Sequence, residues 1–275
     1  MPATPALPTV SIVIPAYNES STIRACVTAA VNQTVPALEI IVVDNKSTDD
    51  TAAIVRELQN QFPDAGIVLE SQHEVQGLIP TRNLGLDRAR GQVRGRIDAD
   101  SILEPNWVEQ VQAAFADPAV AACTGPVIYY DMPLRKFGHR ADDALRRAVS
   151  KLTRDYHLLF GSNMALRDTA WQAIRDDACL DPEDLLHEDI DLSVHLHQRG
   201  LKVAYSSKMV AGMSARRIDD PPRKFYNYIM RYERTYQRHG LKAIALRTPI
   251  FIFLTAYPAL KAVRRNELRK ASRAS

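Results

Sequence analysis

The sequence has few cysteines, an opening segment unlike a secretory signal, and no uncharged apolar run of the length that crosses a membrane, and each feature argues against a class of protein. Its three cysteines, Cys26, Cys123 and Cys179, lie far apart and form no C-x-x-C pair. This spacing argues against a zinc cluster or a disulfide framework and favours a reducing compartment. The opening residues MPATPALPTV have neither a basic nor an apolar region, so no secretory signal is expected.

The longest uncharged apolar stretch is TPIFIFLTAYPAL, at residues 248–260. Thirteen residues are too few to cross about 30 Å of hydrocarbon as a helix. The stretch is therefore expected to lie in a membrane interface or to pack on the domain.

A glycine-rich turn is also missing after the first predicted strand. Pro15-Ala16-Tyr17-Asn18-Glu19 stands where G-x-G-x-x-G or G-x-x-x-x-G-K-[ST] would be, so a Rossmann dehydrogenase or a P-loop enzyme is not expected. Without a glycine cradle for a diphosphate, a divalent cation held by carboxylates is the economical source of positive charge.

The composition is that of an ordinary globular protein, with 46% hydrophobic and 24% charged residues in 275, enough for one large domain or a domain with an appendage. The formal net charge of +3 is unevenly distributed. Residues 261–275 hold six basic residues and one glutamate, a net +5, which leaves a net −2 for residues 1–260. A basic end beside an apolar stretch suits an anionic membrane surface, and a solvated tail explains it equally well.

Strands and helices are predicted to alternate through the first 120 residues. Strands are expected at 9–14, 38–43, 66–70 and about 92–97, and helices at 20–32, 51–62, about 78–90 and from about 105. This alternation predicts an open, mainly parallel α/β sheet, which binds ligands at the carboxyl ends of its strands. The segments PAYNES, DNKSTDD and DADS should therefore converge on one crevice.

The second half of the chain is less regular. Strands are predicted within 119–130, 161–167 and 201–205, with a helix at about 188–199 between the last two. Residues 134–154 predict a helix with seven basic and two acidic residues, and the pattern from Pro221 onward is helical and rich in Tyr and Arg.

Asp98 and Asp100 form a D-x-D triplet, which chance alone supplies about once in a chain of this length. Their position at the end of a predicted strand puts both side chains on one side, where they could hold Mg²⁺ or Mn²⁺. Asp189 and Asp191 form the same triplet within a predicted helix, where residues i and i+2 diverge by about 200°. Only the first pair is expected to act as a two-carboxylate clamp.

Six segments in order give a specific resemblance: VSIVIPAYNESSTI, IIVVDNKSTDDT, TRNLGLDRARG, RIDADS, GSNMALR and HEDIDLSVHLHQRG. Over roughly residues 9–205 the chain resembles the inverting family 2 glycosyltransferases, which have the GT-A fold. The resemblance implies an α/β catalytic domain over 1–215, with a nucleotide-binding half at 1–120 and an acceptor half at 121–215. Residues 216–275 are then a helical, basic extension. It also implies sugar transfer from a nucleotide sugar with a divalent cation, Mn²⁺ or Mg²⁺.

The same resemblance assigns roles to individual residues. Asp100 would ligate the metal directly and Asp98 would contact ribose and metal. Lys46 departs from the glycine or asparagine common in the family. The remaining donor-site residues would be Pro15, Ala16, Tyr17, Glu19, Asp44, Arg82 and Ala99, with Glu19 on the ribose, Asp44 on the base edge and Arg82 on the nucleotide or phosphates.

Transfer also needs a base to take the proton of the acceptor hydroxyl. Glu188 and Asp189 resemble the family's E-D pair, in which the second carboxylate is the usual base. A helix N-terminus ordinarily depresses a carboxylate pKa, so Asp189 is expected to be ionised. Charge that merely complements the helix dipole is the alternative explanation for acidic residues there.

Several further residues have two interpretations each. Arg216 and Arg217 could offset charge on the leaving nucleotide or form a solvated turn. Arg94 and Arg96 are expected to be an exposed pair at a sheet edge rather than partners of phosphates or aspartates. The family's G-x-N-x-x-x-R segment places Gly161, Ser162 and Asn163 near the acceptor and donor sugar, and Trp107 either packs or contacts a sugar. His187, His195 and His197 are not expected to form a zinc site, because His195 and His197 diverge on a helix.

The leading hypothesis is an inverting glycosyltransferase that moves a sugar from a UDP- or GDP-linked donor to a glycan, glycolipid or polyprenyl phosphate acceptor. The alternatives are a retaining GT-A transferase and a catalytically silent carbohydrate-binding or membrane-scaffold protein. We expect a cytoplasmic location, with contact to the inner membrane face through residues 241–275, and no nucleic-acid partner. The sequence does not indicate an oligomeric state.

Overall fold

The computed structural model describes residues 6–133, 135–154 and 156–274. Leu134, which begins the predicted basic helix, and Ser275, which ends the basic tail, lie outside the described residues. Seven strands form the main sheet: β1 (Val10–Ala16), β2 (Glu39–Asp44), β3 (Ile67–Ser71), β4 (Val93–Arg96), β6 (Val120–Thr124), β8 (Met164–Arg167) and β9 (Lys202–Tyr205).

The strand order in this sheet is β3-β2-β1-β4-β8-β6-β9. Strand β8 runs antiparallel to β4 and β6, and the other pairings are parallel. The predicted α/β class with a mainly parallel sheet is confirmed. The helices around it are α1 (Ile23–Val31), α2 (Thr51–Gln61), α3 (Leu78–Arg88), α4 (Trp107–Ala114), α6 (Asp168–Ile174) and α7 (Glu188–Gln198).

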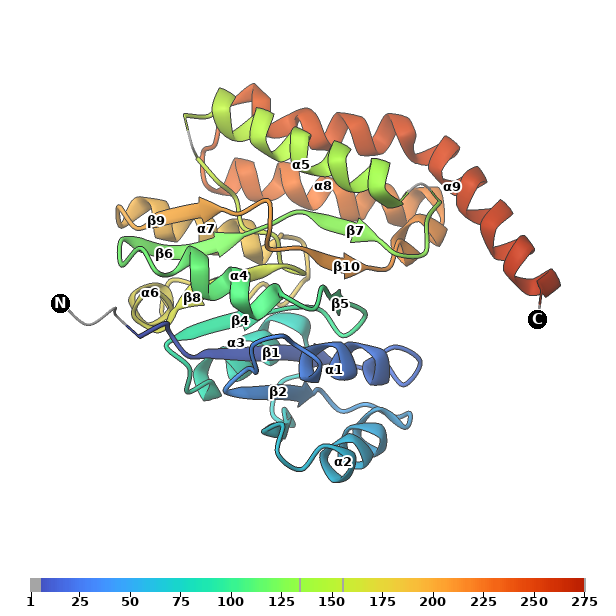
Figure 1. The fold of residues 1–275 in the computed structure, drawn as a ribbon. Coiled ribbons are helices and arrows are strands. Elements are labelled where there is room, and N and C mark those ends of the chain that lie inside the picture. The colour runs from blue at the N-terminus through green and yellow to red at the C-terminus, as the bar shows by residue number, and fades with distance from the viewer. Residues whose placement is uncertain (1–5, 134, 155, 275) are drawn as a thin grey trace.

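Helices pack on both faces of the sheet. Because alternate residues of each strand point to opposite faces, the side chains of one strand belong to two different core clusters. Ile12 and Ile14 of β1 belong to one core cluster with residues of α1, α2 and α4. Val13 belongs to a second cluster, with residues of α3, α6 and α7. The helices thus cover the sheet on both sides and leave the carboxyl ends of β1, β2 and β4 to form a common edge (Figure 1).

The predicted strand at 119–130 divides into two strands that belong to different sheets. Its first part is β6, and its second part, β7 (Val127–Tyr129), joins a small sheet with β5 (Ile102–Leu103) and β10 (Ala211–Met213) in the order β5-β10-β7. Gly125 lies at the division, where a Cβ atom would be 1.9 Å from the backbone oxygen of Met209. Only glycine fits this close approach of two backbone segments.

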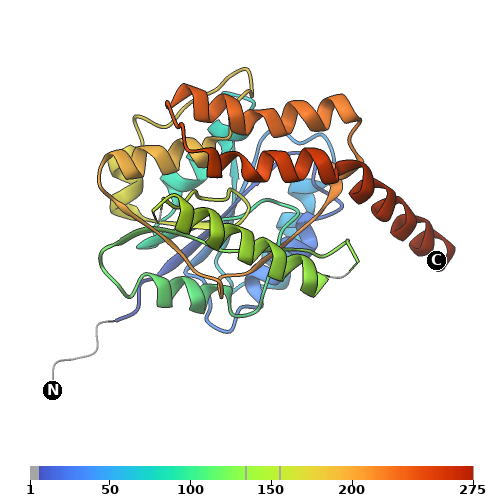
Figure 2. The ribbon, with the colours of Figure 1, turned by 90° about the horizontal axis from the view of Figure 1, so that it is seen from above.

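Three long helices lie together on one side of the molecule: α5 (Arg135–Leu152), α8 (Pro222–Arg238) and α9 (Thr248–Ala274) (Figure 1). Figure 2 shows α9 between α8 and α5, with its C-terminal part extending beyond the rest of the molecule. Two short 3-10 helices, η1 (Arg216–Asp219) and η2 (Ile244–Arg247), lead into α8 and α9. The helical C-terminal extension shares a core cluster with Ile190 of α7.

Helix α9 continues well past the thirteen-residue apolar stretch that the sequence shows. In the described part of the chain, one helical segment, Ile244–Arg269, is long and apolar enough to cross a membrane by length and composition, which is weak evidence for a span. Phe251 and Ile252 of this segment are exposed, whereas Tyr257 and Arg264 are buried. Arg264 forms ion pairs with Asp131 and Asp219, so this part of α9 is docked on the protein.

The expectation of an exposed arginine pair at a sheet edge is wrong. Strand β4, which carries Arg94 and Arg96, lies in the middle of the sheet between β1 and β8. Arg96 has no exposed surface and Arg94 is 5% exposed. Arg94 is paired with Asp168 and Arg96 with Glu188, and the pairing with carboxylates from other elements allows both guanidinium groups to be buried.

Candidate active site

A cavity of about 470 Å³ opens at the carboxyl ends of β1 and β4. All three segments that the sequence predicts to converge supply lining residues: Pro15, Ala16, Tyr17 and Glu19 from the first, Asn45 from the second, and Asp98, Ala99 and Asp100 from the third. Arg82, Gly161, Ser162, Glu188, Asp189, Arg216 and Arg217 also line it. Most of the residues proposed from the sequence therefore surround one space.

Two carboxylates and one arginine meet at the outer side of this cavity. The Arg216 guanidinium donates to both carboxylate oxygens of Glu19, at 2.9 and 2.6 Å, and its Nε lies 2.9 Å from Oδ2 of Asp100. Burial, together with the charge of Asp98, raises the pKa of Asp100 to about 6. Arg216 thus partly neutralises the negative charge of Glu19 and Asp100.

Asp98 is held more firmly than Asp100. Its Oδ1 accepts a hydrogen bond from Arg82 at 2.8 Å, and its Oδ2 accepts one from the Ser162 hydroxyl at 2.5 Å. Although burial opposes ionisation, the Arg82 charge and these hydrogen bonds keep the pKa of Asp98 below its ordinary value.

The D-x-D carboxylates fit a divalent cation by their chemistry. Mg²⁺ and Mn²⁺ prefer oxygen ligands. The pKa of Asp100 is raised first by burial and then by the neighbouring carboxylates of Asp98 and Glu19, whose repulsion a cation would relieve. Asp100 is the more available ligand, because both oxygens of Asp98 already accept hydrogen bonds from protein groups.

Glu188 lies between two buried arginines. One of its carboxylate oxygens is paired with Arg96, and the other accepts from Arg82 at 2.5 Å. The three side chains come from α7, β4 and α3. Because both of its oxygens are engaged by arginines, Glu188 is suited to positioning these side chains rather than to contacting an acceptor hydroxyl.

Asp189, the next residue, has a different environment. Its Oδ2 accepts a hydrogen bond from the Gly161 backbone N–H at 2.7 Å, and the residue is 8% exposed. Burial, followed by the charge of Glu188, raises the pKa of Asp189 to about 6. The expected depression by the helix N-terminus is therefore wrong in direction, because desolvation and the neighbouring carboxylate outweigh the helix dipole.

Gly161 connects these groups through its backbone. Its N–H donates to Asp189, and its carbonyl oxygen accepts from Nε of Arg96 at 3.1 Å. A Cβ atom here would lie 2.5 Å from the Arg96 guanidinium and 3.3 Å from the Asp189 carboxylate. The residue at this position must be glycine for the two side chains to approach the backbone so closely.

The structure places three of the predicted residues away from the cavity surface. Trp107 is fully buried and donates its Nε1–H to Oδ1 of Asn163 at 2.8 Å. Asn163 is also fully buried and donates to the carbonyl oxygens of Pro126 and Met209. The packing interpretation of Trp107 is therefore confirmed, and Asn163 is a core residue that does not line the cavity. Asp44, at the end of β2, is 7% exposed and is not among the residues that line the cavity.

Lys46 follows Asp44 in a backbone conformation with φ of 61°. This is the left-handed region that glycine and asparagine adopt readily. The departure of Lys46 from those residue types thus has a backbone cost.

Sequence reasoning missed the contribution of α8 to this site. Tyr228, Arg231 and Tyr232 of this helix line the cavity, together with His187 at the start of α7. Their spacing of i, i+3 and i+4 puts the three α8 residues on one face of the helix, which is the signal that could have identified them.

A second, smaller cavity of about 110 Å³ lies behind Asp189. It is enclosed by residues of α5, α8 and α9, which the two overall views show side by side (Figures 1 and 2). Aromatic and aliphatic side chains make up most of its lining, including Tyr129, Val149, Tyr205 and Phe253. Asp189 lines both this cavity and the larger one.

An α/β sheet with an acidic D-x-D at a strand end, a buried carboxylate opposite it and no glycine-rich loop defines the GT-A class of fold. The family model for Glycosyl transferase family 2 matches residues 11–175, and that for Glycosyl transferase family group 2 matches residues 96–255. The chain belongs to glycosyl transferase family 2.

Relatives with names agree with this membership. The chain is 33% identical over 126 residues to the glycosyltransferase AglE of Haloferax volcanii, a match that covers 45% of this chain and 41% of that protein. It is 35% identical over 117 residues to a chondroitin synthase of Pasteurella multocida, covering 42% of this chain and 12% of the synthase. The matching region thus spans less than half the length of either relative.

Solved structures share the fold at lower identity. The mannosyltransferase PcManGT of Pyrobaculum calidifontis, in complex with GDP-Man and Mn²⁺, superposes with a TM-score of 0.66 at 22% identity, over 100% of this chain and 78% of that one. Glucosyl-3-phosphoglycerate synthase of Mycobacterium tuberculosis, with Mn²⁺, UDP and phosphoglyceric acid, gives a TM-score of 0.58 at 20% identity, over 87% and 81% of the two chains.

Proposed function

We propose that this chain transfers a sugar from a nucleoside diphosphate sugar to an acceptor hydroxyl in a single inverting displacement, with Asp189 as the general base. The observation that carries the proposal is the position of Asp189, whose side chain lines both the larger and the smaller cavity. A base in this place can take a proton from an acceptor on one side while the donor lies on the other.

The larger cavity is assigned to the donor. Its volume of about 470 Å³ falls in the range of roughly 300 to 1,000 Å³ that is usual for small-molecule sites. Tyr17 and Glu19 would face the base and ribose. Asp44 does not line the cavity, but it precedes Asn45, which does, and its Oδ1 has no hydrogen-bond partner among the described groups, so it would meet a base edge that reaches beyond the cavity wall. The nucleotides bound in the two structural neighbours, GDP-Man and UDP, favour a GDP- or UDP-linked donor.

A divalent cation, Mn²⁺ or Mg²⁺, is assigned to Asp100 with Asp98 beside it. When bound, it would act as a Lewis acid on the diphosphate and offset the charge that develops on the leaving nucleotide. Arg216 and Arg217 line the same cavity. Once a nucleotide is bound, their positive charge would stabilise its phosphates.

Asp189 suits the role of base by its environment. With a pKa of about 6, it is mostly ionised at neutral pH, and its basicity is higher than that of an ordinary aspartate. A positioned base with a pKa near the working pH contributes roughly 10²- to 10⁴-fold to the rate. Glu188 is assigned a positioning role, since Arg82 and Arg96 engage both of its oxygens.

The smaller cavity is assigned to part of the acceptor. Its aromatic and aliphatic lining between α5 and α9 favours a lipid-linked acceptor among glycans, glycolipids and polyprenyl phosphates. The exposed apolar side chains of α9, such as Phe251 and Ile252, together with the basic end of the chain, would place the protein peripherally at the inner face of the cell membrane.

A donor panel tests the reaction itself. Purified protein with UDP-, GDP- and dTDP-sugars and Mn²⁺ is expected to turn over one donor class, and NMR of the product is expected to show the opposite anomeric configuration. Asp189→Asn should lose transfer, whereas Asp176→Asn, which changes an exposed aspartate, should not. Retained configuration, or near wild-type turnover by Asp189→Asn, would contradict the proposed mechanism.

Vesicle binding tests the membrane proposal separately. Phe251→Ser is expected to reduce co-sedimentation with anionic liposomes, because Phe251 is 70% exposed on α9. Leu180→Ser, which changes a similarly exposed residue in the segment before α7, is the matched control. Equal binding by the wild type and Phe251→Ser would count against membrane contact through α9.

A further inference from the structure

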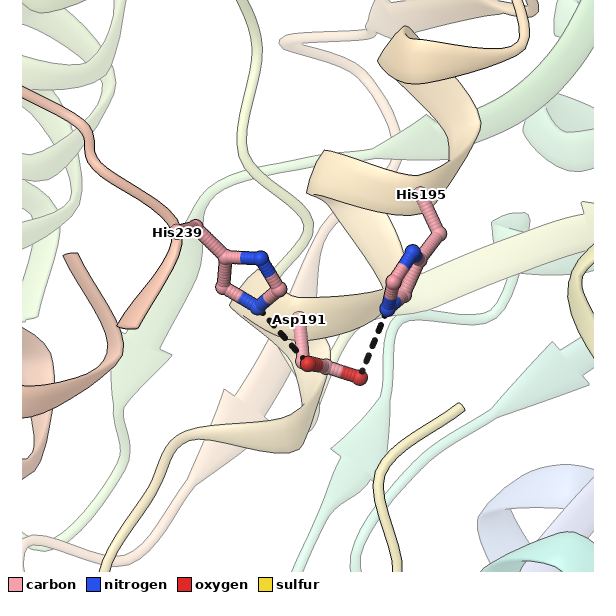
Figure 3. Close-up of side chains that lie close together, drawn as sticks. All are labelled: Asp191, His195 and His239. Carbon is pink, nitrogen blue, oxygen red and sulfur yellow. Dashed lines mark hydrogen bonds and ion pairs between the residues drawn. The ribbon is translucent and has the colours of Figure 1, made fainter. Parts of the chain in front are cut away.

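We propose that Asp191, His195 and His239 form a second metal site, for Zn²⁺ or another transition-metal ion that favours imidazole ligands. It is distinct from the D-x-D carboxylates and goes beyond the proposed transfer reaction. Figure 3 shows the two imidazole rings directed at opposite ends of the Asp191 carboxylate.

The geometry of the three side chains is close to that of a three-ligand site. Nε2 of His239 is hydrogen-bonded to Oδ1 of Asp191 at 2.7 Å, a bond that a shared ion would replace, and Nε2 of His195 lies 3.6 Å from Oδ2. One ligand atom from each residue falls within 4.8 Å of the other two. Ligands at the usual 2.0 to 2.2 Å from zinc are roughly 3.4 Å apart in a tetrahedron, so shifts of well under 2 Å would complete the site.

The spacing of His195 is that of a co-ligand rather than a hydrogen-bonding partner. A separation of 3.6 Å from Oδ2 exceeds the length of an ordinary hydrogen bond. The same Oδ2 accepts the backbone N–H of Cys179 at 2.9 Å. This contact fixes the carboxylate orientation, as outer groups do around metal ligands.

Electrostatics favour a cation at this position. Asp191 is 1% exposed, and the ion-pair partners that the described residues give it are His195 and His239. These partners are imidazoles rather than lysine or arginine side chains, and a buried carboxylate without a permanent positive charge nearby is costly. A bound divalent ion would place two positive charges beside the Asp191 carboxylate.

The ligand set selects the kind of ion. Two imidazole nitrogens and one carboxylate oxygen suit Zn²⁺ and its neighbours, whereas Mg²⁺ and Ca²⁺ require oxygen ligands. The His195 and His239 side chains are 16% and 9% exposed, which leaves water access for a fourth coordination position.

Such an ion would join two elements that shape the donor cavity. Asp191 and His195 lie on α7, two and six residues after Asp189, and His239 caps the C-terminal end of α8. Helix α8 supplies Tyr228 and Arg231 to the cavity wall. The proposed ion would therefore fix the distance between α7, which carries Asp189, and α8, which forms part of the cavity wall.

Metal binding by tag-free protein tests the site. In the presence of millimolar Mg²⁺, which occupies oxygen sites such as Asp100, the wild type is expected to bind one equivalent of Zn²⁺ in calorimetry. With Co²⁺ it should develop a visible absorption band of a nitrogen-ligated ion. His195→Ala and His239→Ala are expected to weaken Zn²⁺ binding by more than the roughly 10- to 100-fold that loss of an outer ligand partner brings.

Three further variants make the result decisive. His73→Ala removes an exposed histidine from a loop and should bind Zn²⁺ like the wild type, as should Asp100→Ala. His239→Gln can still donate a hydrogen bond to Asp191 and keep the fold, but it is expected to lose Zn²⁺ binding. Wild-type protein that binds no Zn²⁺ in Mg²⁺, or His239→Gln that binds it with unchanged affinity, would overturn the proposal.

Discussion

Replacing Asp189 by asparagine is expected to stop sugar transfer and, at the same time, to stabilise the fold. Both effects have one cause, the burial of a carboxylate whose pKa is raised from 3.8 to about 6. Asparagine has nearly the same shape, and its side-chain oxygen can accept the Gly161 N–H that Asp189 Oδ2 accepts in the structure. The substitution therefore removes the charge and the base while it preserves this contact, and it gives up the hydrogen bond that Asp189 Oδ1 accepts from the Ile190 N–H at 3.0 Å.

The sign of the effect follows from proton linkage. A group whose folded pKa exceeds its unfolded pKa contributes stability below the unfolded value, and this contribution is lost as the pH rises through the folded value. The stability advantage of Asp189→Asn over the wild type should therefore grow from about pH 4 to about pH 7. A shift of about two units corresponds to roughly 3 kcal/mol in full, of which about 1.4 kcal/mol develops between pH 5 and pH 8.

Urea unfolding of both proteins at pH 5 and pH 8, with turnover measured at pH 8, checks this prediction. We expect the free energy of unfolding of Asp189→Asn to exceed that of the wild type by more at pH 8 than at pH 5, and turnover to fall at least about 10²-fold. A stability difference that does not change with pH would refute the raised pKa, and a less stable variant at pH 8 would refute the burial argument.

Three other substitutions probe the neighbours of this carboxylate and the core beneath it. Arg96→Met should lower the free energy of unfolding by about 3 kcal/mol, because it breaks a buried ion pair with Glu188. It should also move the acid limb of kcat/KM to higher pH, since Arg96 lowers the pKa of Asp189; an unmoved limb would contradict this coupling. Gly161→Ala should reduce kcat by displacing the Arg96 and Asp189 side chains. Gly138→Ala, at an open helical position, serves as the control. Equal kcat values for the two variants would show that the close approach at Gly161 is unimportant. Trp107→Phe should cost about 1 to 3 kcal/mol in unfolding, because it leaves Oδ1 of buried Asn163 without its donor; a changed KM for the donor would argue against a purely structural role.

The sequence predicts the parts of this protein that depend on local pattern. The strands before Pro15, Asp44 and Asp98 follow from short β-branched runs, and their parallel arrangement follows from the helices between them. The convergence of Glu19, Asp98 and Asp100 then follows from topology alone. These elements agree with the structure because propensity, turn position and packing all favour the same arrangement.

The features that the sequence did not predict depend on partners far away in the chain. Arg96 looks like a residue for an exposed edge until Glu188, 92 residues later, is seen beside it. The pKa direction of Asp189 could not be obtained from its place in a helix, because burial dominates it. His239 meets Asp191 across 48 residues, a contact that no local spacing indicates.

The shared position of Asp189 between two cavities has a kinetic consequence. If the donor and the acceptor occupy the two cavities as proposed, neither substrate has to leave before the other binds. Both must be bound before the sugar is transferred. Initial-rate plots against one substrate at several fixed levels of the second should then intersect rather than run parallel, as for a ternary-complex enzyme. No glycosylated form of the protein should accumulate when the acceptor is withheld.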